Sequence, residues 1–250
     1  MNPFTELIDD AGLLAPGAGG EAVATRHREL RAGPDADAIA TLLIQDRQLA
    51  ATDRLLADAT ETVPVTVINT GGAGGLTALA GRSAQRLAVV AVDTTLRDPG
   101  DLVGNAARVC AAARELDPDI AVHVEIPYGS GWQAAVEEVE AQGLYGLIRM
   151  TTGSAQLVDQ LSGFVEADLS FAVDQLAHPQ LPGLLLALDA LIDDADTTAA
   201  AAVLDSADQQ AQIDAIGSWD DLRWTRVRRR LRRVRCNDPA ALTELLHRWS

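Results

Sequence analysis

The chain has 250 residues, of which 48% are hydrophobic, and it carries 36 acidic and 20 basic residues for a net charge of −16. This length and apolar content suit one large domain or two small ones, and they exclude a disordered chain, a collagen or a coiled-coil array. No apolar run reaches the ~20 residues that a membrane-spanning helix needs, and the first residues lack the pattern of a signal peptide. We therefore expect a cytoplasmic protein that has no membrane partner.

All 20 basic residues are arginine. Without a lysine amine, the chain has no residue for a Schiff base with a substrate or with pyridoxal phosphate, and it lacks the lysine of a P-loop or a kinase. Its two cysteines, Cys110 and Cys236, are too far apart for a metal-binding knuckle and give no disulfide framework. The sequence does not identify a cofactor. A divalent metal is one option, and it is not favoured.

Short apolar runs rich in β-branched residues alternate along the chain with segments of helical spacing. The runs, each predicted to be a strand, span residues 39–44, 63–68, 87–92, 120–126, 144–150 and 168–173. Apolar stripes at helical spacing follow the third, fourth and fifth runs. Because alternating strands and helices build a parallel sheet, the sequence predicts an α/β fold that is either a closed barrel or an open doubly wound sheet.

After about residue 180 the alternation stops, and helices are predicted over residues 182–193, 197–204, 209–216 and 239–249. No linker rich in proline, glycine and serine divides the chain. We therefore expect a single parallel (β/α) barrel-like domain over residues 1–250 that is mainly helical from 180 to 250. Six strands are fewer than the eight of a complete TIM-type barrel, and this shortfall argues against full closure.

Eight of the 20 arginines lie between Arg223 and Arg235, with no acidic residue among them. Apolar residues recur in this segment at spacings of 3, 4 and 3, which predicts one amphipathic helix: Trp224, Val227, Leu231 and Val234. The rest of the chain then holds 12 arginines against 36 acidic residues, a balance of −24. We expect this helix to dock on the acidic body, on a second subunit or on a protein partner, and not on nucleic acid.

A glycine-rich loop, Asn69-Thr70-Gly71-Gly72-Ala73-Gly74-Gly75, follows the second predicted strand and opens a helix. Backbone N–H groups in such a loop can bind a phosphate or another small anion, so Asn69, Thr70, Gly71 and Gly72 are candidate substrate-binding residues. Asp93 ends the next strand, as the ribose-binding acid does in a dinucleotide site, but Thr77 stands where the third glycine of that fingerprint belongs. A plain strand-to-helix turn is the main alternative, and a dinucleotide site is the least favoured.

Further polar residues stand near the carboxyl ends of the predicted strands, where parallel sheets and barrels place their sites. His123 and Glu125 lie two residues apart on one strand and so point the same way. We predict Glu125 as a general base, with Asp93 or His123 as an auxiliary acid or ligand.

Arg149 ends the following strand and is predicted, with Thr152, to bind a carboxylate or phosphate of the substrate. Two alternatives stay open. Glu125 and Arg149 could form an ion pair that only fills the barrel mouth, or Asp93, His123 and Glu125 could hold a divalent metal.

A set of short segments runs in order along most of the chain: residues 9–17, 21–23, 27–28, 65–74, 96–98, 101–102, 124–127, 149, 152–153 and 235–236. In these segments the chain resembles a group of uncharacterised (β/α) barrel-like proteins of GC-rich bacteria. The resemblance implies a barrel with Glu125 and Arg149 at matching strand ends, and it supplies no activity. Leu147 and a residue near Leu169 stand where the group has lysines, and Leu181-Pro-Gly-Leu-Leu replaces a His-Gly-Phe-Leu-Asn-like helix opening.

Two functions follow from these observations. The first is a lyase- or isomerase-like enzyme that acts on a small phosphorylated or carboxylated metabolite at the carboxyl ends of the strands. The second is a non-catalytic, degenerate barrel that acts as a binding or assembly partner, which the missing lysines favour.

Overall fold

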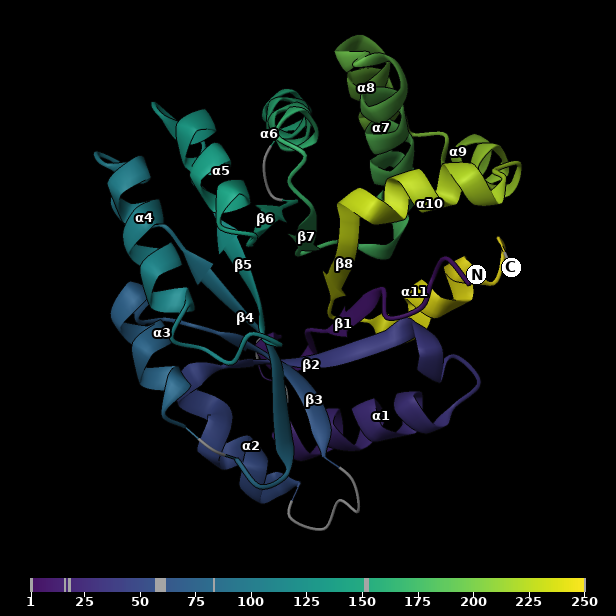
Figure 1. Ribbon diagram of the computed structural model, residues 1–250. Coiled ribbons are helices and arrows are strands. Elements are labelled where there is room, and N and C mark those ends of the chain that lie inside the picture. The colour runs from purple at the N-terminus through teal and green to yellow at the C-terminus, as the bar shows by residue number, and fades with distance from the viewer. Residues whose placement is uncertain are drawn as a thin grey trace.

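Eight parallel strands close into a ring in the computed structural model, which describes residues 2–15, 17, 19–56, 62–82, 84–150 and 153–249 (Figure 1). The strands follow one another around the ring in chain order, and the last pairs with the first. They are β1 (Ile8–Asp10), β2 (Ile39–Gln45), β3 (Val63–Ile68), β4 (Leu87–Thr95), β5 (Ala121–Glu125), β6 (Tyr145–Arg149), β7 (Phe171–Asp174) and β8 (Leu231–Cys236). The predicted parallel (β/α) barrel is confirmed.

The α-helices lie around the outside of this ring (Figure 1). In the first part of the chain they are α1 (Gly20–Ala32), α2 (Leu49–Leu55), α3 (Gly72–Ala80), α4 (Leu102–Ala113), α5 (Trp132–Ala141) and α6 (Ser154–Glu166). After β7 come α7 (Leu181–Asp194), α8 (Thr197–Leu204), α9 (Gln209–Gly217), α10 (Asp221–Arg230) and α11 (Pro239–Leu246). Helices α8, α9 and α10 contact α7, so most of the predicted helical C-terminal part forms the connection between β7 and β8.

Full closure of the barrel corrects the expectation drawn from six strands. The two strands that the sequence analysis missed are β1 and β8, which pair with each other. β1 has only three residues, and because Asp9 and Asp10 are two of them, it lacks the apolar run that marks a strand. β8 has the sequence Leu-Arg-Arg-Val-Arg-Cys. With three arginines it lacks an apolar run, and its two apolar residues Leu231 and Val234 continue the helical spacing of the preceding segment.

The segment from Arg223 to Arg235 is therefore not one helix, as predicted, but a helix followed directly by a strand. α10 ends at Arg230, and Leu231 begins β8, which pairs with β7 and β1. Four buried apolar residues produced the misleading stripe, two in α10 and two in β8: Trp224, Val227, Leu231 and Val234. Helical and strand periods cannot be separated over so few positions, and only the pairing partners decide between them.

The inner and outer faces of the barrel differ sharply in polarity. Outward residues such as Val65, Val67 and Val124 are fully buried between the strands and the helices, where the main apolar core lies. The inner face is polar at mid-height: Thr41 Oγ1 donates to Asp9 Oδ1 at 2.7 Å and lies 2.8 Å from Thr66 Oγ1. Barrels of this type usually fill the lumen with branched apolar side chains. A polar lumen therefore needs its own network of hydrogen bonds and ion pairs.

Close packing of α5 against α6 depends on Gly163, and replacing it with alanine is expected to cost about 1–3 kcal/mol of unfolding free energy. A Cβ at this position would overlap the six-membered ring of the Trp132 indole. Because phenylalanine lacks those outer ring atoms, the same Gly163→Ala change in a Trp132→Phe background should cost clearly less. Chemical denaturation of the four proteins measures this coupling, and an equal cost in both backgrounds would contradict it.

Candidate active site at the carboxyl end of the barrel

A charged network occupies the middle of the lumen, with Arg235 at its centre. Nη2 of Arg235 donates to Asp93 Oδ1 at 2.7 Å, and Nε lies 3.4 Å from Asp9 Oδ2. His123 Nδ1 lies 3.0 Å from the same Asp93 oxygen and 3.2 Å from Arg235 Nη2. At most 5% of each of these side chains is exposed. Arg233 Nη1 lies 3.2 Å from Asp9 Oδ1, so two guanidiniums face the two carboxylates. Since buried charges are tolerated only when matched, these four groups hold one another in place.

The surroundings of His123 favour its neutral form. Complete burial lowers the pKa of His123, its hydrogen bond with Asp93 acts in the opposite direction, and the nearby Arg235 cation lowers it again. Among the residues that the structure describes, His123 Nε2 and Arg235 Nη1 are buried and have no hydrogen-bond partner. A buried polar atom in this state is costly, and in native proteins it often marks a functional site or a site for water or an ion.

Glu125, Arg149 and Asp174 form a row at the carboxyl ends of β5, β6 and β7. Glu125 Oε2 accepts hydrogen bonds from Thr95 Oγ1 at 2.6 Å and from Arg149 Nη2 at 2.8 Å. Arg149 Nε lies 3.8 Å from Asp174 Oδ2. The Arg149 side chain is 43% exposed, so the pair of Glu125 and Arg149 lies at the open mouth and is not sealed in the lumen.

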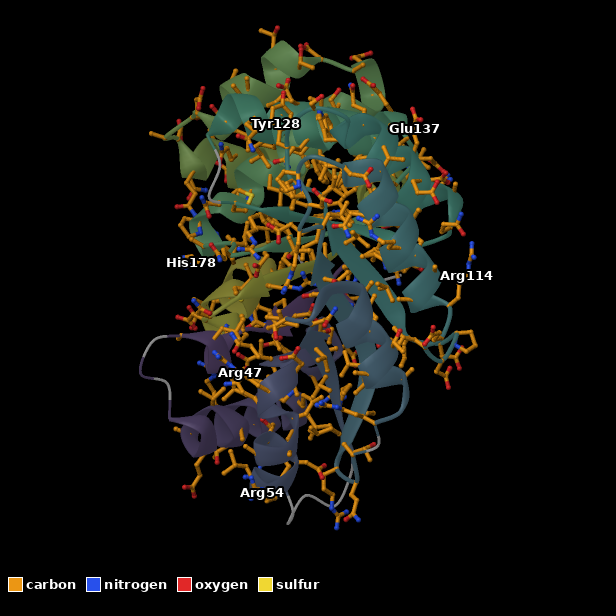
Figure 2. All side chains as sticks on the ribbon, turned by 90° about the vertical axis from the view of Figure 1, so that its left-hand side faces the viewer. Arg47, Arg54, Arg114, Tyr128, Glu137 and His178 are labelled. Carbon is orange, nitrogen blue, oxygen red and sulfur yellow. The ribbon has the colours of Figure 1, made fainter. Side chains whose placement is uncertain are left out.

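A pocket of about 460 Å³ opens at the carboxyl ends of β7, β8 and β1. An apolar wall of this pocket includes Leu14 and Leu176. The polar residues that line it are Asp174, Gln175, His178, Arg235, Asn237 and Asp238. Figure 2 shows His178, which follows β7, on the same side of the molecule as Arg47, which follows β2, whereas Arg114 at the end of α4 lies on the opposite side. The pocket thus belongs to the face where barrels of this type carry their active sites.

Asp174 and Cys236 are titratable groups in this pocket whose acidity is altered, and burial raises the pKa of the Cys236 thiol to about 12. Burial raises the pKa of the Asp174 carboxyl, and although the Arg235 and Arg149 cations lower it, the nearby Asp93 carboxylate adds to the increase. A carboxyl with a raised pKa can take up and release a proton closer to neutral pH than an ordinary aspartate can. The geometry therefore offers a proton-transfer group beside a buried guanidinium.

The sequence analysis missed both of the residues that define this pocket. Its sixth predicted strand stopped at residue 173, one position before Asp174, so that carboxyl was not counted among the strand ends. Arg235 was assigned to a helix face. The alternation of arginines at 233 and 235 about a buried Val234 was a signal for a strand with a charged inner face.

The structure places the three predicted catalytic residues in the same barrel but at different depths. Glu125 lies at the mouth, while Asp93 and His123 lie below it in the lumen network. In the described part of the chain, no group of three or more His, Cys, Asp or Glu side chains is arranged to hold a metal ion. Thr152, the remaining predicted substrate-binding residue after Arg149, lies outside the described residues.

The glycine-rich loop is held by contacts within the protein. Thr70 N donates to Asp46 Oδ2 at 2.7 Å, and Gly71 N donates to Asn69 Oδ1 at 2.9 Å. Partial burial alone would raise the pKa of Asp46, but hydrogen bonds from Thr70 and the Arg47 backbone keep it below its ordinary value. Two of the N–H groups proposed for a phosphate therefore already have acceptors, and one of these is an anionic carboxylate.

A packing requirement explains part of the glycine content of this loop. A Cβ at Gly75 would overlap the Asn69 side chain, which is buried and donates to Gly72 O at 2.7 Å and to Thr94 Oγ1 at 3.1 Å. Asn69 thus ties the end of β3 to the start of α3 and to β4. This arrangement supports the plain strand-to-helix turn that the sequence analysis gave as its main alternative.

Arginines of α10 form ion pairs with the acidic body of the same chain. Arg223 donates to both oxygens of Asp189, with its Nε at 2.9 and 3.0 Å from them, and Arg226 pairs with Asp193. Asp189 lies on α7 and is buried. These contacts are those expected of docking onto the acidic body, whereas a protein partner or a second subunit stays a prediction.

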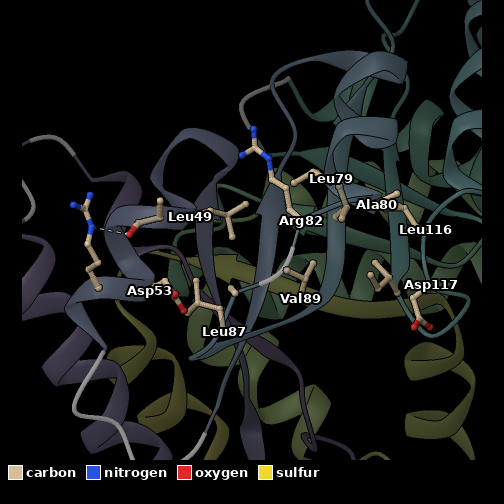
Figure 3. A pocket seen from close by; sticks show the side chains of 14 residues that line it. Leu49, Asp53, Leu79, Ala80, Arg82, Leu87, Val89, Leu116 and Asp117 are labelled. Carbon is tan, nitrogen blue, oxygen red and sulfur yellow. Dashed lines mark hydrogen bonds between the residues drawn. The ribbon is translucent and has the colours of Figure 1, made fainter.

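A larger pocket of about 820 Å³ lies between α2, α3 and the start of β4 (Figure 3). Its walls are mainly apolar, with Leu49, Leu79, Leu87 and Val89 among them, and charged side chains such as Asp53 stand at its edge. None of the described residues predicted for catalysis or substrate binding lines this pocket, and none lines the smaller, polar pocket. The smaller pocket is the candidate site because it lies at the carboxyl ends of the strands and is lined by Asp174 and Arg235.

No protein family matches the chain, and comparisons with curated proteins and with solved structures give no match either. The site must therefore be judged on its own geometry. No helix among the described residues has both the length and the apolar character needed to cross a membrane.

Proposed function

We propose that this protein is a lyase- or isomerase-like enzyme that transfers a proton on a small carboxylated or phosphorylated metabolite bound at the carboxyl end of the barrel. One observation carries the proposal: Asp174, whose pKa is raised, and Arg235, whose Nη1 is buried without a hydrogen-bond partner in the described structure, line the same pocket. A base beside an anion-binding cation is the arrangement that such chemistry needs.

In this proposal Asp174 is the general base. It takes a proton from the carbon next to a carboxylate or carbonyl group of the substrate. The Arg235 and Arg149 guanidiniums, which already act on the Asp174 carboxyl, offset the negative charge that develops on the substrate oxygens. Returning the proton to the carbon gives an isomerase, and loss of a neighbouring leaving group gives a lyase.

Glu125 remains the second candidate for the base, as the sequence predicted. Its carboxylate is partly exposed at the mouth and accepts from both Thr95 and Arg149, so its lone pairs are more engaged than a free base requires. Asp93 and His123 act in this proposal through Arg235, since they contact it and hold its guanidinium beneath the pocket.

A non-catalytic barrel is the alternative function, and the charge-matched lumen network supports it. Arg235 is bound between Asp9 and Asp93, a contact that would be needed for stability whether or not a substrate binds. A protein of this kind could bind the same anions without turnover. The two functions therefore share the pocket and differ in whether Asp174 moves a proton.

Arg149→Gln is expected to weaken the binding of small carboxylates and phosphate esters by roughly tenfold, because it removes a cation beside the pocket. The test is a thermal-shift screen of such metabolites, followed by calorimetry on the hits; a ligand at about 100 times its dissociation constant adds about 2.7 kcal/mol of stability. Arg108→Gln is the charge-matched control, since Arg108 lies on α4 and pairs with Asp98 and Asp101. Equal weakening by both variants, or no ligand at all, would contradict an anion site at the mouth.

A further inference from the structure

The opposite, amino-terminal end of the barrel carries a second group of arginines, gathered by an irregularity in β8. Phe171 of β7 pairs with Leu231, but its neighbour Ala172 pairs with Arg233, so Arg232 is an extra residue in the strand. Such a bulge redirects side chains and is common at the rims of barrels. The Arg232 guanidinium carbon lies 4.1 Å from the centre of the Tyr145 ring, at the start of β6.

Five arginines from the last turn of α10 and the first half of β8 define what we call the amino-end cluster: Arg228, Arg229, Arg230, Arg232 and Arg233. The charges of Arg232 and Arg233 act on Arg228, and Arg229 and Arg230 share one carboxylate. Three carboxylates form ion pairs with its members. Asp168 pairs with Arg229 and Arg230, while Glu6 and Asp9 pair with Arg233. Among the described residues the cluster therefore has five positive charges against three negative ones, an excess of two, in a protein whose net charge is −16.

Two members of the cluster have no carboxylate in an ion pair with them among the described residues. Arg228 donates instead to backbone carbonyls, including Arg232 O at 2.9 Å and Thr5 O at 3.2 Å. Burial lowers the pKa of Arg228 to about 10, and the Arg233 and Arg232 cations contribute to this, which shows how closely the like charges are crowded. Crowding of this kind is unfavourable unless an anion relieves it.

The amino-end cluster also contains N–H donors that have no acceptor among the described residues. In the described structure, Arg232 Nε and Arg230 Nη1 are buried atoms with no hydrogen-bond partner. Arg232 is held by stacking on Tyr145, which fixes the plane of its guanidinium without using its N–H groups. Preoriented, unsatisfied guanidinium donors are the usual means by which proteins bind planar or tetrahedral oxyanions.

We propose that the amino-end cluster is a binding site for a phosphate group, either inorganic phosphate or a phosphate monoester. A phosphate carries about −1.5 to −2 charges at neutral pH and three or more strong acceptor oxygens, which matches an excess of two positive charges and the unused donors of Arg230 and Arg232. The site lies at the opposite end of the barrel from the Asp174 pocket, so it does not depend on the function proposed for that pocket. The strongly acidic body around it disfavours long polyanions such as nucleic acid.

The test follows the side-chain Nε–Hε signal of Arg232 by ¹⁵N NMR during titration of the full chain with inorganic phosphate. The signal is assigned by its disappearance in Arg232→Gln. We expect a saturable shift at millimolar phosphate, and a roughly tenfold weaker affinity, read from other signals, in Arg232→Gln. Arg229→Gln, at an exposed position, reduces the charge of the cluster while sparing the buried contacts, so it should weaken binding even if Arg232→Gln does not fold.

Controls separate this site from the carboxyl-end pocket and one phosphate source from the other. Arg149→Gln and Arg108→Gln should leave the Arg232 titration unchanged. Methyl phosphate that binds as well as inorganic phosphate would point to a monoester as the ligand, and weaker binding would point to free phosphate. A shift that does not saturate, an equal effect of acetate, or a titration unaffected by Arg229→Gln would each overturn the proposal.

Discussion

Replacing Arg235 with methionine is expected to lower the free energy of unfolding by about 3–5 kcal/mol. Methionine fills a similar length without a charge, so the change removes the guanidinium from the lumen while keeping much of its volume. Asp93 would then stay buried without a cation, since His123 would be its remaining partner among the described residues, whereas Asp9 would keep Thr41 and Arg233. Leaving a buried carboxylate without its partner is among the costliest single changes in a protein.

Urea denaturation followed by tryptophan fluorescence measures this loss. Arg108→Met is the matched control because Arg108 is 54% exposed and its ion pairs lie on the surface, so its replacement should change stability by no more than about 0.5 kcal/mol. Adding Asp93→Asn to Arg235→Met should recover part of the loss, since it removes the carboxylate that has lost its cation. Equal losses in Arg235→Met and Arg108→Met would mean that the lumen network does not stabilise the barrel.

Asp174→Asn is expected to reduce turnover by about 10²- to 10⁴-fold while the protein stays folded. The proposed base is removed, but the shape of the pocket and its cations remain. Because burial raises the pKa of Asp174 in the folded protein, this carboxyl favours folding at low pH and loses that contribution as the pH rises through its folded pKa. At neutral pH asparagine should therefore cost little stability and can even increase it.

The pH profile of kcat/KM distinguishes a base from a merely structural residue. In the unchanged protein, activity on a ligand found by the binding screen should increase as the pH rises through the elevated pKa of Asp174, and Asp174→Asn should lose this acidic limb. Glu125→Gln is the comparison. If Glu125→Gln abolishes turnover and Asp174→Asn does not, the base is Glu125, as the sequence suggested, and the assignment to Asp174 is wrong. If a bound ligand is turned over by neither the variants nor the parent, the protein is a binding protein.

Part of the barrel mouth could be predicted from the sequence, because strand ends can be located from local patterns, but Asp174 and Arg235 of the candidate pocket could not. Glu125 and Arg149 were expected to lie at neighbouring strand ends. In the structure they form an ion pair at the mouth, with 2.8 Å between Arg149 Nη2 and Glu125 Oε2. His123 and Glu125 were expected to share a face, and the β4–β5 register places His123 beside Asp93 and Glu125 beside Thr95 on the inner side. The depth of each residue was not accessible, because it depends on the tilt and stagger of strands around a closed barrel.

The sequence by itself determined six of the strands and most of the helices that pack on their outward faces. Apolar runs and helical stripes are local patterns that arise because strands and helices bury their facing sides against each other, and six of the eight strands follow from them. Tertiary structure alone decided the charged network around Arg235 in the lumen. No local pattern places Asp9 or Arg235 in the lumen: both side chains lie there because β1 and β8, from opposite ends of the chain, pair with each other. A buried charge needs a partner of opposite charge. Because Asp9 and Arg235 are far apart in the sequence, no local pattern shows that they form such a pair.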